Sequence, residues 1–434
     1  MIDVDVAVIG GGPAGVAAAR EAARAGMAVA LVDAEGAGGR AARTTTIPMR
    51  MLGRAADAGR TDWDAIRGEI RERTLAWSER VALGLGDAGV ELVRGRARFA
   101  SPTSLAVDGG PTIRFERAVI AAGAAPASLP GAPPDGRALF VPDQLVELAA
   151  LPKEAMVIGG GSAGAELADA LSRMGVRVTW VMDELGLLPR FDRELAEAVG
   201  DVLMSRGVKL VHDKPVGDVS IGSPGVLAKL EGGRTYAAPI AFLAVGSRPT
   251  VEHLALEAAG VELDALGAIH VDERCATSAP HVFAAGDVTG KTGDVAGAEA
   301  MGRAAGRRAA GIEASFDASR IPRAAYTTPE IAQVGIGADQ AAGREVILHT
   351  LRLEESIAGH LARIGERPEA KGFVRLICAS EDGRLLGASA LGPGAASAVS
   401  AAALALAIGA TDAALAGGAV ATPSPLEAMV RALR

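Results

Sequence analysis

The stretch VDVAVIGGGPAG at residues 4–15 decides the fold of this chain. An apolar strand, Val4–Ile9, runs directly into the glycine pattern G-x-G-x-x-G, and a helical pattern begins near Val16. The first glycine permits a tight turn, the second lets the backbone approach a pyrophosphate, and the third lets the helix pack on the strand. The phosphates then meet the unpaired N–H groups and the positive end of the helix. The stretch therefore predicts a dinucleotide-binding site.

The sequence after this turn supports the same interpretation. A second apolar strand, Ala28–Val32, ends at Asp33, where a carboxylate can accept hydrogen bonds from a ribose. The pattern then returns, with the strand Ala155–Ile158, the glycine turn Gly159–Gly164 and the strand Val176–Val181. Two complete fingerprints predict two dinucleotide sites, and the alternative is one working domain with one degenerate copy.

Composition limits the class of protein. The 434 residues are 49% apolar and can bury a large core, and the formal charge of −8 argues against a nucleic-acid partner. Cys275 and Cys378 are far apart, and neither they nor the six histidines show metal-ligand spacing, so we expect ordinary thiols and no metal site. The N-terminus enters the first strand directly and no apolar run is long enough to cross a bilayer. We therefore expect a soluble cytoplasmic protein.

Two further segments have clear patterns. A long amphipathic helix is predicted over Asp62–Ala88. Its apolar side is expected to hold Ile66, Ile70, Trp77, Val81 and Leu85. From about Ile321 the strands shorten and an alanine-rich helix follows at Ala396–Ile408, which predicts a third, α+β domain.

Motifs along the whole chain resemble those of the flavoprotein disulfide reductases, the pyridine nucleotide-disulfide oxidoreductase family that includes dihydrolipoamide dehydrogenase. The motifs that carry the resemblance are Gly10–Gly15 with Asp33, Gly159–Gly164 with Glu166, Ala284–Asp287, Tyr326–Glu330, Val334–Gly335, Gly383–Gly387 and Leu391–Gly394. The resemblance implies an α/β fold with two Rossmann-like domains, FAD in the first site, NADH or NADPH in the second, and a C-terminal α+β domain that forms a homodimer. It implies an FAD domain at 1–148 and 266–320, an NAD(P) domain at 149–265 and a dimerisation domain at 321–434.

The resemblance also assigns residues to roles. Around FAD it places Gly10, Gly12, Pro13, Ala14, Gly15, Asp33, Gly39, Arg40, Ala122, Gly123, Gly286 and Asp287. Around the nicotinamide dinucleotide it places Gly159, Gly161, Gly164, Asp183 and Gly246. The catalytic positions of the family fall on Thr46, Arg50, Glu166 and Glu427.

The redox segment departs from the family. Ala41 and Thr46 stand where the family has two cysteines, and Thr422 stands where it has a base histidine, so that Glu427 has lost that histidine as its partner. Disulfide exchange needs a thiolate, and a threonine hydroxyl does not shuttle protons near neutral pH as imidazole does. The sequence therefore argues against a disulfide reductase. The soluble transhydrogenases resemble this pattern most, and hydride exchange between nicotinamides needs no dithiol.

Two arginine-containing features leave alternatives open. Arg50 and Glu166 match the family's Lys–Glu pair beside the flavin, and they either place a positive charge near the flavin or form an interdomain brace. Arg40 and Arg43 flank small side chains where the disulfide would cover one flavin face. A pocket there could admit an anionic acceptor, and the alternative is that both arginines are solvated or hold FAD phosphates.

The sequence predicts an FAD-dependent NAD(P)H oxidoreductase that reduces a non-disulfide acceptor, a quinone or a similar small molecule, with no nucleic-acid or membrane partner. Met182 occupies the acid position after the second-domain strand, with Asp183 next and no arginine cluster, which favours NADH. The alternatives are a soluble transhydrogenase, a catalytically idle FAD-binding scaffold or sensor, and a flavin oxidase of a small metabolite.

Overall fold

The apolar run at the start of the chain forms β1 (Ile2–Ile9), whose last four residues are buried. It pairs in parallel with β2 (Val29–Asp33) on one side and with β6 (Ile113–Ile120) on the other. A parallel strand is usually covered on both faces, which accounts for a sequence that is continuously apolar there rather than alternating. The helix α1 (Pro13–Arg24) follows the glycine turn, so the predicted strand–turn–helix order is confirmed.

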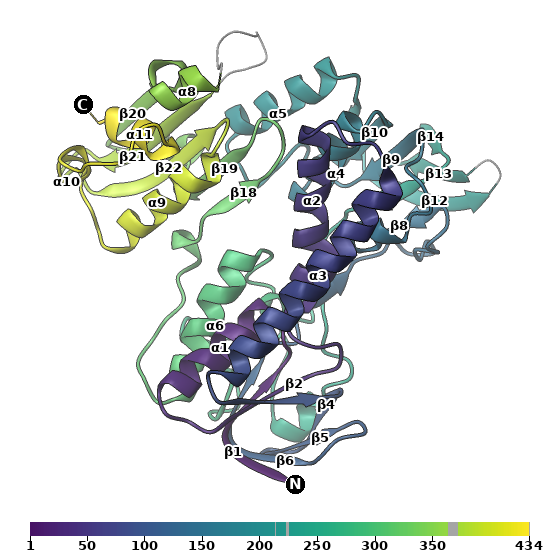
Figure 1. Cartoon of the computed structure of the whole chain (residues 1–434), viewed down its shortest axis with the longest axis vertical. Coiled ribbons are helices and arrows are strands. Elements are labelled where there is room, and N and C mark those ends of the chain that lie inside the picture. Colours follow the sequence, from purple (N-terminus) through teal and green to yellow (C-terminus); the bar gives the residue numbers. More distant parts are fainter. Residues whose placement is uncertain (213, 223–224, 363–371, 434) are drawn as a thin grey trace. The chain divides into compact units, whose positions relative to one another are not determined.

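The computed structural model describes residues 1–212, 214–222, 225–362 and 372–433 (Figure 1). The chain divides into two compact units, and each unit contains one of the two glycine turns. The first unit consists of Met1–Pro48, Arg67–Ala127 and Ser247–Ala318. The second consists of Met49–Ile66, Ser128–Gly246 and Ser319–Arg434.

A seven-stranded sheet forms the centre of the first unit. Its order is β3-β2-β1-β6-β5-β4, with β17 paired in parallel to β6. The remaining bounds are β3 (Val90–Arg94), β4 (Ala97–Ser101), β5 (Ser104–Val107) and β17 (Val282–Ala284). The strands β1, β2, β3, β6 and β17 are parallel, so their carboxyl ends meet at one edge, the place where open α/β sheets bind ligands.

Two helices of the first unit cross at unusually small residues. A Cβ on Gly302 of α6 (Val295–Ala309) would overlap the carbonyl oxygen of Ala14, and one on Gly306 would overlap that of Ala18. Both alanines lie on α1 and are buried. The backbones of the two helices therefore approach each other as closely as glycine allows, and Figure 1 shows them beside each other.

The predicted long helix is α3 (Trp63–Gly86), which follows α2 (Thr46–Asp57). Four of the five expected apolar positions are buried, but the prediction for Trp77 was wrong, because its residue is 49% exposed. At about 100° per residue, Trp77 lies only about 20° around the helix from Ile66, so its angle is that of a core-facing position. Its exposure instead reflects what adjoins the helix there, because Trp77 lines a cavity rather than packing in the core.

The second unit contains a parallel sheet with the order β11-β10-β9-β15-β8. Its bounds are β8 (Leu139–Phe140), β9 (Glu154–Ile158), β10 (Arg177–Met182), β11 (Lys209–His212) and β15 (Ala241–Leu243). The helices α4 (Ser162–Arg173) and α5 (Arg193–Ser205) follow β9 and β10. An antiparallel sheet adds β12 (Val216–Gly222), β13 (Gly225–Leu230) and β14 (Thr235–Ala238).

The C-terminal part of this unit is a five-stranded antiparallel sheet with the order β18-β19-β22-β21-β20. Its bounds are β18 (Arg323–Ala325), β19 (Ile331–Gly335), β20 (Val346–Arg352), β21 (Phe373–Ala379) and β22 (Leu385–Leu391). The helices α9 (Ala395–Ala407), α10 (Asp412–Ala416) and α11 (Pro425–Arg431) follow. Buried residues of α9 and α11 join those of the strands in one apolar core.

Short elements complete the chain. They are a π-helical turn at Ala41–Thr45, the paired strands β7 (Ala124–Pro126) and β16 (Ser247–Pro249), the helices α7 (Ala338–Ala341) and α8 (Ile357–Leu361), and 3-10 turns at Pro142–Glu147, Leu256–Ala259, Asp287–Thr289, Ala318–Arg320 and Leu353–Glu355. The predicted α/β class with a C-terminal α+β part is confirmed. Within the described residues, no helix combines the length and apolar sequence that a bilayer crossing needs.

The glycine contact between α1 and α6 predicts opposite effects of two alanine substitutions. Gly302→Ala should lower the free energy of unfolding by about 1–3 kcal/mol, because the added methyl overlaps backbone of α1. The matched control is Gly68→Ala on α3, where a Cβ meets no described heavy atom within 4 Å. That change should raise the free energy of unfolding by about 0.5–1 kcal/mol through helix propensity. Urea unfolding measures both values, and a stabilising Gly302→Ala would contradict the contact.

Candidate functional site

The three glycines of the G-x-G-x-x-G pattern in the first turn are Gly10, Gly12 and Gly15, and their surroundings differ. Gly10 has a φ of +108°, and a Cβ there would overlap the carbonyl oxygen of Ala121, while a Cβ on Gly15 would overlap that of Gly10. These two glycines are needed by the protein's own packing. At Gly12 the nearest described atom to a Cβ is the Cα of Gly39, 3.9 Å away, which is ordinary contact. Packing within the described protein therefore does not account for glycine at position 12, where the fingerprint expects a pyrophosphate to approach.

Asp33 lies at the end of β2, beside this turn. Its Oδ2 accepts a hydrogen bond of 2.6 Å from the N–H of Gly11, and its Oδ1 accepts one of 2.8 Å from the N–H of Glu35. A carboxylate has about four lone-pair directions, so both oxygens keep capacity for a further donor. The backbone therefore orients Asp33 at the carboxyl edge of the sheet, where a ribose hydroxyl would reach it.

A second carboxylate of the first unit, Asp287, lies after β17. Its Oδ1 accepts a hydrogen bond of 2.6 Å from the Thr292 hydroxyl. Burial raises the pKa of the Asp287 carboxyl, the Thr292 hydrogen bond and the Arg40 guanidinium lower it, and Asp294 raises it again. Arg40 also donates to the carbonyl oxygen of Ala124, which follows the predicted residues Ala122 and Gly123. Arg40 therefore lies in the field of Asp287.

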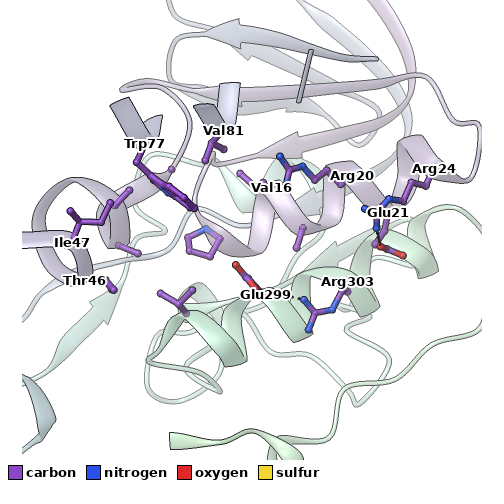
Figure 2. A pocket seen from close by; sticks show the side chains of 16 residues that line it. Val16, Arg20, Glu21, Arg24, Thr46, Ile47, Trp77, Val81, Glu299 and Arg303 are labelled. Atoms are coloured by element: carbon purple, nitrogen blue, oxygen red, sulfur yellow. Dashed lines mark hydrogen bonds and ion pairs between the residues drawn. The ribbon is translucent and has the colours of Figure 1, made fainter. Parts of the chain in front are cut away.

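A cavity of about 340 Å³ lies in the first unit between α1, the segment Gly38–Ile47, α3 and α6, and we call it the helix cavity. Ala41, Ala42 and Thr46 form part of its wall, so the small side chains do leave a pocket, as the sequence suggested. Figure 2 shows the indole of Trp77 on one side and α6 on the other.

The charged residues of the helix cavity are not those that the sequence suggested. The charged residues that line the cavity are Arg20, Glu21, Arg24, Glu299 and Arg303. Three arginines and two glutamates give the lining a formal charge of +1. Glu21 pairs with Arg24 at 2.8 Å and Glu299 with Arg303 at 3.7 Å. These side chains follow one another along α1 and α6 in Figure 2. Sequence reasoning missed them because they look like the ordinary solvated face of a helix.

Arg43, which the sequence also suggested for this pocket, does not line the helix cavity. Its guanidinium pairs with Glu35 at 2.8 Å and donates to the carbonyl oxygen of Gly36 at 2.8 Å. It therefore holds the loop after β2, which contains Gly38 and Gly39, both at positive φ.

In the second unit, Arg50 of α2 and Glu166 of α4 form the predicted pair, 2.8 Å apart. The same carboxylate oxygen of Glu166 accepts the N–H of Tyr326, and the guanidinium of Arg50 lies 3.6 Å from the centroid of the Tyr326 ring. Burial raises the pKa of the nearby Glu330 carboxyl. The charge of Arg50 acts to lower this pKa, and the charge of Glu166 acts to raise it. Arg50 is thus held by an ion pair and a cation–π contact within one unit.

The second glycine turn repeats the geometry of the first. A Cβ on Gly159 would overlap the carbonyl oxygen of Ala244, and one on Gly164 would overlap that of Gly159. At Gly161 a Cβ would meet no described heavy atom within 4 Å, as expected for a position that a ligand approaches. The indole N–H of Trp180 on β10 donates a 2.8 Å hydrogen bond to the carbonyl oxygen of Gly159 and so ties the turn to that strand.

The segment after β10 lies against this second turn. Met182 is buried, and the N–H of Leu188 donates to the carbonyl of Gly160 at 2.8 Å. Asp183 is exposed and its Oδ1 accepts the N–H of Leu185. Gly246, at the end of the neighbouring strand segment, has a φ of +101°. The preference for NADH over NADPH stays a prediction.

Glu427 lies on α11 and is paired within that helix. Its Oε1 forms an ion pair with Nε of Arg431, one helical turn later, at 2.7 Å. The same oxygen accepts a hydrogen bond from the N–H of Ile357. Its Oε2 is buried and has no hydrogen-bond partner among the described residues. The carboxylate of Glu427 is therefore paired with a cation from its own helix, α11.

Comparisons with known proteins agree with this geometry. Residues 4–302 match the model of the pyridine nucleotide-disulphide oxidoreductases, and residues 321–433 match the dimerisation domain of the same family. Dihydrolipoyl dehydrogenase of Thermus scotoductus is 34% identical over 433 residues, 94% of this chain and 92% of that protein. Dihydrolipoyl dehydrogenase 2 of Haloarcula marismortui is 30% identical, over 90% and 87% of the two chains.

Two solved structures have the same fold as this chain. LpdA of Mycobacterium tuberculosis has a TM-score of 0.92 at 27% identity, with 100% of this chain and 99% of that chain covered. The HOCl-induced flavoprotein disulfide reductase RclA of Escherichia coli, in its Cu(II) complex, has a TM-score of 0.86 at 25% identity, with 100% and 98% covered.

The environment of Asp287 predicts a pH-dependent stability. Because burial raises the pKa of this carboxyl above its unfolded value of about 3.9, ionisation opposes folding. Its stability penalty is absent below about pH 4 and fully developed above the folded pKa. Asp287→Asn should therefore match the natural protein at pH 4 and exceed it increasingly as the pH rises to 7. Urea unfolding of FAD-free protein measures this difference, and a difference that does not change with pH would refute the assignment.

Proposed function

The chain belongs to the pyridine nucleotide-disulphide oxidoreductase family, and we propose that it passes electrons to a small acceptor other than a disulfide, such as a quinone. Like the members of this family, it is an FAD-dependent oxidoreductase that uses NADH or NADPH. FAD supplies the chemistry that side chains lack, because it takes a hydride from a nicotinamide and returns two electrons to an acceptor.

The available thiols support an acceptor that is not a disulfide. The chain has two cysteines, Cys275 and Cys378, and both are buried. Burial, with a contribution from Asp272, raises the pKa of Cys275 to about 12, and burial, with Asp412, raises that of Cys378 to about 11. Disulfide exchange needs an accessible thiolate, so neither side chain is suited to it. Ala41 and Thr46 have no thiol to offer.

The helix cavity is the observation that carries the proposal. It opens beside Ala41, Ala42 and Thr46, where the family resemblance puts the dithiol, and its volume suits a small aromatic molecule. The Trp77 indole offers a flat apolar surface, and the lining arginines favour an acceptor with negative charge. A small planar quinone fits these properties.

We assign the cofactors to the two glycine turns. Gly10–Gly15 and Asp33 would hold the FAD pyrophosphate and ribose, and Asp287 with Arg40 its ribityl–phosphate region. Gly159–Gly164 would hold the nicotinamide dinucleotide, and Arg50 with Glu166 would supply the fixed cation that the resemblance gives to the family's Lys–Glu pair. The domains are taken as 1–148 with 266–320 for FAD, 149–265 for NAD(P) and 321–434 for a homodimer contact.

The proposal predicts a specific anaerobic spectrum. NADH should bleach the bound flavin within one turnover, without a long-wavelength thiolate charge-transfer band, and an added quinone should restore the yellow colour. Lipoamide and glutathione disulfide should not restore it. The double variant Ala41→Cys with Thr46→Cys is the positive control for the missing band. A spectrum unmoved by NADH and NADPH would overturn the proposal, and reoxidation by a nicotinamide analogue alone would favour a transhydrogenase.

The charge of the helix cavity predicts a selective effect of one substitution. Arg303→Gln changes the lining charge from +1 to 0, so the KM for a sulfonated quinone should rise about three- to tenfold. The KM for an uncharged quinone with the same ring, and kcat for both, should change little. Arg98→Gln, on β4 and paired with Asp108, is the matched control. Equal changes for both quinones would place the acceptor outside this cavity.

A further inference from the structure

Three residues with metal-ligand side chains meet in the C-terminal part of the second unit. They are His349 on β20, Cys378 on β21 and Asp412, the first residue of α10. One ligand atom from each residue lies within 4.8 Å of the other two. They are 29 and 34 residues apart in the sequence, which explains why spacing alone did not reveal them.

The sheet brings the histidine and the cysteine together. In the β20–β21 register Ile347 pairs with Cys378 and His349 pairs with Leu376. Residues two apart on a strand share a face, so His349 and Cys378 are diagonal neighbours on one face, within reach of long side chains. This face carries the buried cluster that includes Leu376 and Cys378.

A glycine lets the aspartate join them. The N–H of Asp412 donates to the carbonyl of Gly383 at 2.8 Å, and Gly383 has a φ of +71°. A Cβ on Gly383 would overlap the carboxylate of Asp412. The turn before β22 therefore leaves room for this carboxylate at the start of α10.

The histidine nitrogen in this cluster has unused bonding capacity. Nε2 of His349 is buried and has no hydrogen-bond partner among the described residues. It lies 3.7 Å from Oδ2 of Asp412, which is too long for a hydrogen bond. A simple ion pair would close this gap, because a buried polar atom without a partner is costly. The separation is instead close to that between two ligands of one metal ion.

We propose that His349, Cys378 and Asp412 bind one zinc ion. Zinc takes thiolate sulfur, imidazole nitrogen and carboxylate oxygen, and tetrahedral coordination places such atoms about 3.3–3.6 Å apart. Small movements of the three side chains close the site to this size. A thiolate and a carboxylate also neutralise a divalent cation, which suits a largely buried position.

The coordination would have a structural consequence. Three protein ligands leave the fourth position for water, so the ion exchanges with solvent through the partly exposed side of His349 and Asp412. The ion would join the edge strand β20, the neighbouring strand β21 and the short helix α10. This site lies in another part of the fold from both glycine turns and the helix cavity, and it stands independently of the proposed electron acceptor.

The test is a zinc titration of the full-length, FAD-loaded protein with any affinity tag removed and metals stripped by a chelator. Competition with a chromophoric chelator should give one zinc per chain with a Kd of about 1 μM or lower. Cobalt should give a thiolate-to-metal band in the difference spectrum. Cys378→Ser and Asp412→Asn should each weaken zinc binding at least about 100-fold, whereas Cys275→Ser should leave it unchanged.

Asp412→Asn keeps the proposal testable if Cys378→Ser fails to fold, because Asp412 is at the surface end of the cluster. Zinc should also raise the Tm of the natural protein and of Cys275→Ser, but not that of Asp412→Asn. Binding without a cobalt–thiolate band, binding that Asp412→Asn leaves unchanged, or no stoichiometric binding would overturn the proposal.

Discussion

The carbonyl oxygen of Gly10 lies where Gly15 would otherwise carry a Cβ, and this contact fixes how α1 follows β1. It brings the first turn of the helix to the carboxyl edge of the parallel sheet, where unpaired N–H groups can meet an anion. The contact recurs between Gly159 and Gly164, with Ala244 in the place of Ala121. Both cofactor sites therefore depend on two backbone segments touching without a side chain between them. On α6, Gly302 and Gly306 extend the same principle to a helix crossing.

The middle glycines of the two turns, Gly12 and Gly161, are not required by contacts among the residues that the structure describes. Gly12 and Gly161 have room for a Cβ within the described protein, unlike the glycines on either side of them. In a G-x-G-x-x-G turn, a middle glycine that the protein's own packing does not require fits the close approach of a pyrophosphate. The chain thus has two glycine turns of this form, while Ala41 and Thr46 carry no thiol. What remains beside them is the helix cavity, whose wall charges come from α1 and α6.

Features that depend on neighbouring residues in the sequence could be predicted, and those that depend on tertiary neighbours could not. The glycine turns, Asp33 and the Arg50–Glu166 pair follow from local patterns or a family resemblance. Trp77 did not, because periodicity identifies a helix face but not whether core or cavity adjoins it. Arg303 resembled a solvated arginine, and Arg431 stood outside the motif that contains Glu427. His349, Cys378 and Asp412 meet only through strand register and a glycine turn.

Arg50 illustrates why an arginine at this position differs from a lysine by more than the length of its side chain. Its guanidinium faces Glu166, lies over the Tyr326 ring and is within the field of Glu330. A lysine ammonium can form the ion pair, but only a planar group stacks face to face on the ring while its edge donates to the carboxylate. Arginine also stays protonated at any physiological pH. The cation in this position is therefore fixed in both charge and orientation, which suits a constant electrostatic contribution better than a proton-transfer step.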